Sequence, residues 1–257
     1  MRNSKAAIEK RREHILKIIE YRTNVTVEEL AEQLKTSPIT IRRDFDYFEG
    51  KDLIERHRGG ASLNKINFTT NIFSSSLTLN KHAIAKAAAR FVEDGDTIFI
   101  NTSSTALLML EYITAKQVTI VTNNGKAIFC ESKDNLFVVL TGGELRMPKE
   151  SLVGDFAINN LNRVKAAKSF LGCSGISAEG GFTTAVLQEV AINEIMLKNT
   201  VGMKFVLADK NKVGKVHSFL SGSISQLDYL ITDVFASEVE VKSLRSNGLK
   251  VIQVPID

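Results

Sequence analysis

Residues 27–63 read VEELAEQLKTSPITIRRDFDYFEGKDLIERHRGGASL. The segment opens with a short amphipathic pattern, VEELAEQL, and the residue before it, Thr26, is of a type that caps helices. Lys35-Thr36-Ser37 then makes a tight connection. Pro38 suits the first position of a second helix, because no hydrogen bond is lost there. The spacing therefore predicts two short helices, the second over 38–49, joined by a three-residue turn.

The second helix has one apolar side and one cationic side. Ile41, Phe45 and Phe48 recur at i, i+4 and i+7 and predict a buried stripe. At about 100° per residue, Arg43 points away from that stripe and Arg42 flanks it. Two helices joined by a tight turn, with the second cationic near its start, indicate a helix-turn-helix. In such a motif the second helix reads base edges in the major groove of DNA.

A further helix precedes this pair. Ile8, Ile15, Ile18 and Ile19 recur at helical spacing with charged residues between them, and we expect the helix to end near Tyr21.

The residues after Gly50 predict a small β-hairpin, or wing. Its basic part is Arg56, His57 and Arg58, and Gly59-Gly60 permits a tight turn. Cations in such a wing can reach DNA phosphates. The residues expected to contact DNA are Thr26, Ser37, Pro38, Thr40, Arg42, Arg43, Tyr47, Arg56, His57 and Arg58.

Arg42 and Arg43 have a second interpretation, in which they pair with Asp46 and Glu49 on a solvated helix face. A solvated face does not require a capped turn or a basic wing, so DNA binding is favoured. The charge distribution points the same way. The first 65 residues hold 14 Lys/Arg and 11 Asp/Glu, against 19 and 18 in the remainder. Most of the net charge of +4 therefore lies in this first quarter.

Two cysteines, Cys130 and Cys173, show no disulfide or metal spacing, so we expect buried thiols in a reducing compartment. The first residues, MRNSKAAIEKRRE, lack the apolar run of a signal peptide. No run reaches the roughly 18 apolar residues of a membrane span. We expect a cytoplasmic protein with no membrane segment, no metal and no cofactor.

The sequence predicts an α/β fold in three parts: a winged helix-turn-helix domain over 1–63, a polar linker over 64–80, and an effector-binding domain over 81–257. In the last part, apolar runs alternate with helical stretches, which predicts a mostly parallel sheet covered on both faces. The expected strands are TIFIN at 97, VTIVT at 118, LFVVL at 136, SFLGC at 169, KFVLA at 204, YLITD at 229 and KVIQV at 250. The expected helices are 80–92, 104–114, 125–132, 154–163, 187–198 and 238–246.

The chain resembles the DeoR family of sugar-metabolism regulators. The resemblance rests on Thr40-Ile41-Arg42-Arg43-Asp44 and Gly59-Gly60-Ala61, and continues through VTNN at 121–124, GGEL at 142–145, SLVG at 151–154, EGGFTT at 179–184 and LADKNKVG at 207–214. It implies a DNA-binding repressor that a phosphorylated sugar or a related metabolite releases. It also implies a C-terminal domain similar to ribose-5-phosphate isomerase.

Asn101, Thr102, Ser103, Ser104 and Thr105 follow the first expected strand of the C-terminal domain and open a helix. Hydroxyls and free N–H groups at a helix start suit a phosphate, although an ordinary Ser/Thr cap explains them equally. The resemblance favours effector binding. The chain departs from the family at two positions. It has Asn101 where the family usually has an acidic residue, and Ser103 where the family usually has glycine.

Further candidates for effector contacts lie at other strand ends. Gly142 and Gly143 fit a binding cleft or a structural turn, as does the later pair Gly180-Gly181. Glu189 could accept a sugar hydroxyl or face water, and Lys212 could meet a ligand oxygen or be solvated.

The likeness to the isomerase leaves one alternative function, a sugar-phosphate isomerase-like enzyme with an accessory DNA-binding arm. The acidic positions of that enzyme's motif correspond to Ser174 and Ser177, and a serine cannot act as a carboxylate base. Glu189 lacks an evident carboxylate partner. No G-x-S-x-G, P-loop or G-x-G-x-x-G is present. We expect ligand binding without turnover and no catalytic residue.

One winged module makes a small interface with DNA, too little for tight specific binding. We therefore expect a homo-oligomer that pairs two modules on repeated half-sites of double-stranded operator DNA.

Overall fold

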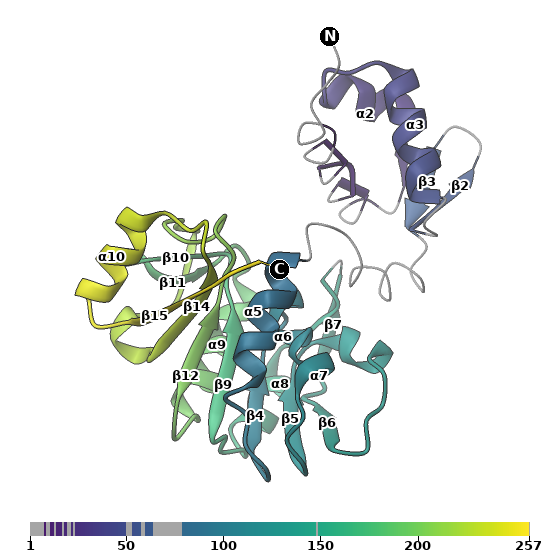
Figure 1. The fold of residues 1–257 in the computed structure, drawn as a ribbon. Helices are drawn as coiled ribbons and strands as arrows, with labels where there is room; N and C mark the ends of the chain where they lie inside the picture. Colours follow the sequence, from purple (N-terminus) through teal and green to yellow (C-terminus); the bar gives the residue numbers. More distant parts are fainter. Residues whose placement is uncertain are drawn as a thin grey trace. The chain divides into compact units, whose positions relative to one another are not determined.

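The computed structural model of the 257-residue chain describes residues 8, 11–12, 14–16, 18–19, 22, 24–49, 53–57, 60–63, 79–147 and 149–256. The chain divides into two compact units, Met1–Leu77 and Thr78–Asp257 (Figure 1). Helix α5 begins at Leu79, so the last two residues of the expected linker are helical. The rest of that linker, 64–78, lies outside the described residues.

The N-terminal unit contains the expected helix-turn-helix. Helices α2 (Val27–Gln33) and α3 (Pro38–Glu49) are joined by a turn in which Lys35 adopts a left-handed φ of 48°. Thr26 and Glu29 form a capping box at the start of α2: Thr26 Oγ1 accepts from Glu29 N (3.2 Å), and Thr26 N donates to Glu29 Oε2 (3.0 Å). The capping box therefore fixes the first turn of α2.

The expected wing is present as well. Strands β1 (Val25–Thr26), β2 (Ile54–His57) and β3 (Gly60–Leu63) form an antiparallel sheet in the order β1-β3-β2. Gly60 allows β3 to approach β1 closely, since an added Cβ would lie 2.3 Å from Val25 O. Wing residues Arg58 and Gly59 lie outside the described residues.

The core of the N-terminal unit joins the two predicted helices to the segment before them. Residues 11–12, 14–16 and 18–19 are helical, as expected, while Tyr21, the expected end of that helix, lies outside the described residues. The largest fully buried side chains among the described residues of this unit are those of Ile15, Ile19, Leu30, Ile41, Phe45 and Phe48. The stripe on α3 is thus confirmed as a core face.

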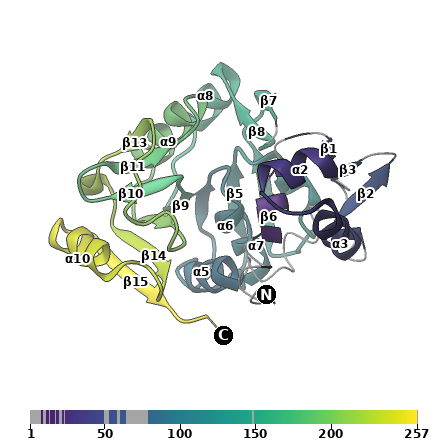
Figure 2. The same cartoon turned by 90° about the horizontal axis from the view of Figure 1, so that it is seen from above.

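The centre of the C-terminal unit is an all-parallel, seven-stranded sheet in the order β15-β14-β12-β9-β4-β5-β6. All seven predicted strands are confirmed: β4 (Thr97–Ile100), β5 (Val118–Thr122), β6 (Leu136–Leu140), β9 (Lys168–Gly172), β12 (Lys204–Leu207), β14 (Tyr229–Asp233) and β15 (Lys250–Val254). Later strands are added on both sides of β4, so β5 and β6 lie toward one end and β14 and β15 at the other (Figure 2).

Helices cover both faces of this sheet (Figure 1). On one side lie α5 (Leu79–Ala89), α6 (Ser104–Leu107) and α7 (Met109–Tyr112). On the other lie α8 (Asp155–Leu161), α9 (Gln188–Lys198) and α10 (Glu238–Ser246), which pack on alternate strand residues such as Phe99 and Leu171. The predicted helix at 104–114 is divided into α6 and α7, and that at 125–132 is a 3₁₀ turn, η1 (Gly125–Phe129).

Two smaller sheets were not predicted. Strands β10 (Gly175–Ser177), β11 (Gly181–Thr184) and β13 (Phe219–Gly222) form one, and the hairpin β7 (Glu144–Arg146) and β8 (Ser151–Val153) forms the other. A short turn, η2 (Ile224–Gln226), follows β13.

The expectation that both faces of the main sheet are covered is wrong at β6. This edge strand leaves Phe137 57%, Val138 42%, Val139 46% and Leu140 37% exposed. Each of the other strands of the sheet has at least one buried hydrophobic residue, which in the opposite edge strand β15 is its last residue, Val254.

Candidate functional sites

The outer side of α3 carries the side chains expected to meet DNA. Ser37, Pro38, Arg42 and Arg43 are exposed, whereas Thr40 is half-buried. Ser37 caps the helix: its Oγ accepts from Thr40 N (3.2 Å) and lies 2.8 Å from Thr40 Oγ1. These two hydroxyls therefore fix the first turn, while the two arginines project from it.

The arginines of α3 do not make the ion pairs that the alternative interpretation expected. Arg42 Nη2 lies 3.8 Å from Glu28 Oε1, and both side chains are exposed, so the pair is weak. Arg43 has no hydrogen-bond or ion-pair partner among the residues that the structure describes. Arg43 is therefore the cation of α3 that is best placed to bind a group outside the protein.

The carboxylates of α3 pair with the wing instead. Arg56 Nη1 lies 2.5 Å from Asp46 Oδ1 and 3.6 Å from Glu49 Oε2. Arg56 thus joins β2 to α3 and is less free for phosphate contact than the sequence suggested. His57 is exposed beside it, and Arg58 lies outside the described residues.

An inner ion cluster fixes α3 from behind. Asp44 is 1% exposed and accepts hydrogen bonds from Arg11 Nε (2.6 Å) and Arg12 Nε (2.9 Å). The Arg12 guanidinium also lies 3.6 Å from the ring centre of Tyr47, which is 39% exposed. Tyr47 is thus held in place at the edge of the DNA-facing side.

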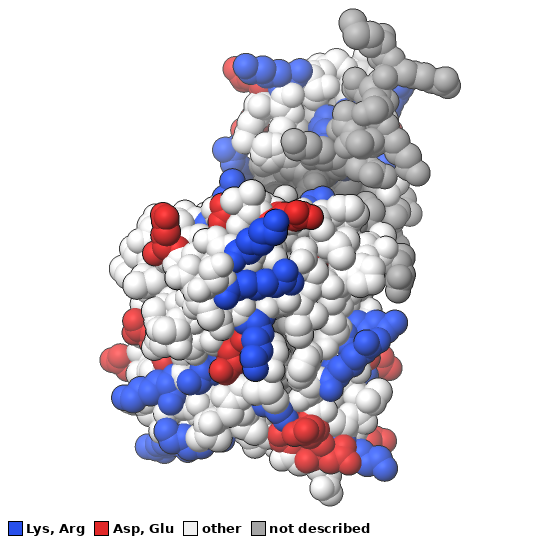
Figure 3. All heavy atoms as spheres, turned by 60° about the vertical axis from the view of Figure 1, so that its left-hand side comes forward, with Lys and Arg blue, Asp and Glu red and all other residues white. Residues whose placement is uncertain are grey.

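The C-terminal unit does not present a field of one sign on the face drawn in Figure 3, where basic and acidic side chains alternate. Its polar groups gather instead at the carboxyl ends of the central strands. Since strands are added in opposite directions from β4, the gap between β4 and β9 is the topological switch point, where ligands bind in open α/β sheets.

Asn101 occupies this switch point. Its Oδ1 accepts from Gly172 N, and its Nδ2 donates to Gly172 O and Asn193 Oδ1, each at 2.9 Å. Asn193 Nδ2 donates in turn to Ser221 Oγ (3.2 Å). Because both amide hydrogens of the buried Asn101 are used within the protein, its side chain fixes the position of the loop that follows β4.

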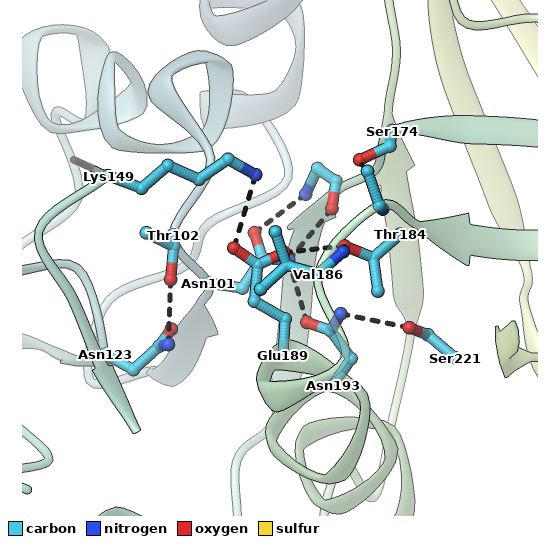
Figure 4. A network of polar contacts seen from close by, with 12 residues as sticks. Asn101, Thr102, Asn123, Lys149, Ser174, Thr184, Val186, Glu189, Asn193 and Ser221 are labelled. Atoms are coloured by element: carbon cyan, nitrogen blue, oxygen red, sulfur yellow. Dashed lines mark hydrogen bonds and ion pairs between the residues drawn. The ribbon is translucent and has the colours of Figure 1, made fainter. Parts of the chain in front are cut away.

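Thr102 and Glu189 belong to a polar network beside Asn101 (Figure 4). Asn123 Nδ2 donates to Thr102 Oγ1 (2.8 Å). Glu189, in the first turn of α9, accepts from Thr184 Oγ1 (2.7 Å) and pairs with Lys149 Nζ (3.3 Å). Together these groups offer hydroxyls, an amide, an ammonium and a carboxylate at one strand edge.

The remaining residues of the 101–105 segment have different surroundings. Ser103 caps α6 and points at β9, since a Cβ on Gly172 would lie 1.9 Å from Ser103 Oγ. Its side chain therefore fills space that a glycine at position 103 would leave open. Ser104 Oγ accepts from Lys81 Nζ of α5 (3.1 Å), and Thr105 is fully buried.

The other candidates lie outside this network. Gly142 and Gly143 have left-handed φ values of 67° and 111°, and a Cβ on Gly143 would lie 2.4 Å from Val153 O. These contacts support the structural-turn interpretation. Lys212 follows β12. Burial raises the pKa of the Cys173 thiol to about 12, and this effect outweighs that of the positive charge of Lys212, which lowers the same pKa.

The enzyme alternative finds no support in the serines after β9. Ser174 Oγ accepts from Ala185 N (3.1 Å), which joins the segments before β10 and after β11, and Ser177 Oγ accepts from Gly180 N (2.9 Å), which closes the turn between these strands. The raised pKa keeps the Cys173 thiol protonated and unreactive. Among the described residues, no group of three or more His, Cys, Asp and Glu side chains could hold a metal ion. No helix formed by those residues is long and apolar enough to cross a membrane.

Comparison with known families identifies both units. The DeoR-like helix-turn-helix domain matches residues 11–67, and the DeoR C terminal sensor domain matches residues 77–234. The chain belongs to the DeoR family. This DeoR-family protein is a DNA-binding transcriptional regulator.

Those relatives match along most of their length. The lactose phosphotransferase system repressor of Streptococcus mutans is 33% identical, over 88% of this chain and 92% of the relative. The glycerol-3-phosphate regulon repressor of Escherichia coli is 30% identical, over 85% and 88%. The uncharacterized HTH-type transcriptional regulator YulB of Bacillus subtilis is 29% identical, over 97% and 98%.

Solved structures superpose less closely. The sorbitol operon regulator SorC of Klebsiella pneumoniae has a TM-score of 0.42 and 12% identity, over 86% of this chain and 94% of that one. Ribose 5-phosphate isomerase A of Methanocaldococcus jannaschii has a TM-score of 0.37 and 18% identity, over 54% and 55%.

Several residues of the network were not predicted from the sequence. Asn123, Lys149 and Thr184 bind partners 21, 40 and 5 positions away, and Lys81 binds Ser104 across 23 positions. The position of Asn123 directly after an apolar strand was a usable signal, whereas nothing in the local sequence marks Lys149.

Proposed function

We propose that this DeoR-family protein represses a sugar-metabolism operon. In this proposal a homo-oligomer binds operator DNA through α3 and the wing. A phosphorylated sugar then binds at the carboxyl ends of β4, β5 and β9 and releases the DNA. The observation that carries the DNA-binding part is Arg43, which lies on the exposed side of a capped α3 and has no partner among the described residues.

The effector part rests on the chemistry of the strand-end network. A sugar phosphate needs cationic or hydroxyl donors for its phosphate and acceptors for its hydroxyls. Thr102, Ser104, Thr105 and Lys212 supply donors, and Glu189 supplies an acceptor. Two relatives named for the lactose phosphotransferase system and the glycerol-3-phosphate regulon support a phosphorylated metabolite of this class.

A homo-oligomer follows from the small size of one DNA-binding unit. A single winged module buries too little surface for specific affinity, so pairing two modules on repeated half-sites is required. Effector binding would then shift the population of module arrangements away from the one that fits the operator.

Selection from a random duplex library, followed by fluorescence anisotropy, tests DNA binding. We expect a sequence containing repeated half-sites and an affinity that falls steeply with salt. A protein that ignores every duplex at low salt would overturn the proposal.

Release from the selected duplex by a panel of pentose, hexose and triose phosphates tests the effector part. Thr105→Ala and Lys212→Ala should leave DNA affinity unchanged but weaken release. If the cognate phosphosugar releases these variants and the native protein from DNA equally well, neither residue belongs to the effector site.

A further inference from the structure

The connection between β7 and β8 brings a lysine to the effector region. Its backbone is fixed to the segment after β5, because Leu152 N donates to Asn123 O (2.8 Å) and Gly125 N donates to Glu150 O (2.7 Å). Asn123 Nδ2 also donates to Leu152 O (3.1 Å). Lys149 therefore extends from a backbone that is held directly beside the strand-end network.

The side chain of Lys149 reaches over this network. In Figure 4 it extends past Thr102 toward Glu189, and its Nζ lies 3.3 Å from Glu189 Oε1. The Lys149 side chain is 39% exposed, whereas that of Glu189 is only 11% exposed. The ammonium thus remains accessible to an incoming anion while its present partner is buried.

Five buried polar side-chain atoms lack a hydrogen-bond partner among the described residues, and three of them lie in α6, directly after β5 and in β8. Within the described structure, Thr105 Oγ1, Asn123 Oδ1 and Ser151 Oγ are buried and make no hydrogen bond. Such atoms are costly to leave unsatisfied, so they indicate a place that a polar ligand completes. The two hydroxyls can donate to anionic oxygens, and the amide oxygen can accept from a sugar hydroxyl.

We propose that Lys149 is a phosphate-binding residue of the effector site and that it exchanges the Glu189 carboxylate for a phosphate oxygen of the effector. The exchange frees Glu189 Oε1 to accept from a sugar hydroxyl, while Thr184 continues to hold Oε2. This inference rests on the proposed function, because it adds a residue to the site where the effector would bind.

Inorganic phosphate tests this exchange without requiring the cognate sugar. Isothermal titration of the full chain should show phosphate binding that Lys149→Met weakens by about tenfold or more, as expected on losing a charge-assisted hydrogen bond. Lys165→Met is the matched control: Lys165 bonds to Asn199 Oδ1 (2.7 Å), and it precedes β9 at the opposite, amino-terminal edge of the sheet. This control variant should bind phosphate like the native protein.

A variant of the competing carboxylate should act in the opposite direction. Glu189→Gln removes the charge that Lys149 now pairs with, so phosphate should bind several-fold more tightly. If the Lys149–Glu189 pair had only a structural role, Lys149→Met and Glu189→Gln would not change phosphate affinity in opposite directions. Lys149→Arg, which keeps the charge, should restore most of the affinity.

Unfolding curves for each variant separate binding from misfolding. Phosphate affinity that is the same in Lys149→Met and the native protein would overturn the inference, and so would a native protein that fails to bind phosphate. Release of operator DNA by sugar phosphates is measured in parallel. Equal release of native protein and Lys149→Met refutes only the role of Lys149, whereas absence of release in the native protein refutes the proposed function.

Discussion

Asn101 and Gly172 are joined by two hydrogen bonds across the switch point between β4 and β9. Asn101 Oδ1 accepts from Gly172 N, and Asn101 Nδ2 donates to Gly172 O, both at 2.9 Å. The second amide hydrogen of Asn101 is directed to Asn193 Oδ1. Two strands and helix α9 are thereby fixed to one another at the edge where the effector is proposed to bind.

This arrangement makes the effect of an acidic residue at position 101 predictable. An aspartate could accept from Gly172 N, but it could not donate to Gly172 O or to Asn193 Oδ1. Asn101→Asp should therefore lower the free energy of unfolding of the C-terminal unit by about 2–4 kcal/mol. Chemical denaturation followed by circular dichroism measures this, with the exposed Asn247→Asp as the control. An unchanged midpoint would contradict the role given to Asn101.

Arg43 provides a prediction on DNA recognition. Arg43→Ala should weaken binding to the selected operator by about 1–3 kcal/mol and reduce discrimination against altered bases. The matched control is Arg163→Ala, which removes an exposed arginine of the C-terminal unit. Fluorescence anisotropy with operator and scrambled duplexes measures both the loss of operator affinity and the loss of discrimination. An operator affinity that survives the substitution would remove Arg43 from the readout.

Asp44 provides a prediction on stability. Asp44→Asn leaves Arg11 and Arg12 without their buried carboxylate, so we expect the N-terminal unit to lose about 2 kcal/mol. The figure lies below that for a fully buried pair because the two arginine side chains are 15% and 25% exposed. Asp46→Asn, on the same helix but exposed, should cost under about 0.5 kcal/mol. Thermal unfolding compares them, and equal losses would argue against the inner ion cluster.

Glu29 provides a prediction on pH. Hydrogen bonds from Thr26 N lower the pKa of the Glu29 carboxyl below its ordinary value of 4.5. Because the pKa of Glu29 is lower in the folded state, its ionised carboxylate stabilises the folded protein at pH values above the unfolded-state pKa. This stabilisation is lost as the pH falls through the folded-state pKa. Acidification below about pH 4.5 should thus destabilise α2. Glu29→Gln keeps a neutral cap and should reduce this dependence, and a slope unchanged by the substitution would contradict it.

The sequence predicted the elements whose signals are local. Ile41, Phe45 and Phe48 marked the buried side of α3, and the seven apolar runs marked the main sheet. Strands β10 and β11 were missed because they are three and four residues long, rich in glycine, and set by pairing with each other rather than by their own pattern.

The candidate site was predicted in part. Thr102 and Glu189, two of the residues expected to contact the effector, lie in the polar network, and that expectation stays a prediction. The local pattern could not distinguish them from Asn101 and Ser103, whose side chains are directed at Gly172. Lys149 was missed because its place depends on how the β7–β8 hairpin packs against the segment after β5. Such long-range contacts leave no periodic trace in the chain.

The exposed edge strand β6 has a consequence for measurements in concentrated anions. Sulfate and phosphate are excluded from protein surfaces and strengthen the burial of apolar groups, while an unblocked strand edge invites pairing between molecules. Raising the phosphate concentration therefore favours self-association through β6 as well as occupancy of any anion site. Sedimentation velocity at each phosphate concentration distinguishes self-association from occupancy of an anion site. An equal concentration of chloride does not reproduce the self-association.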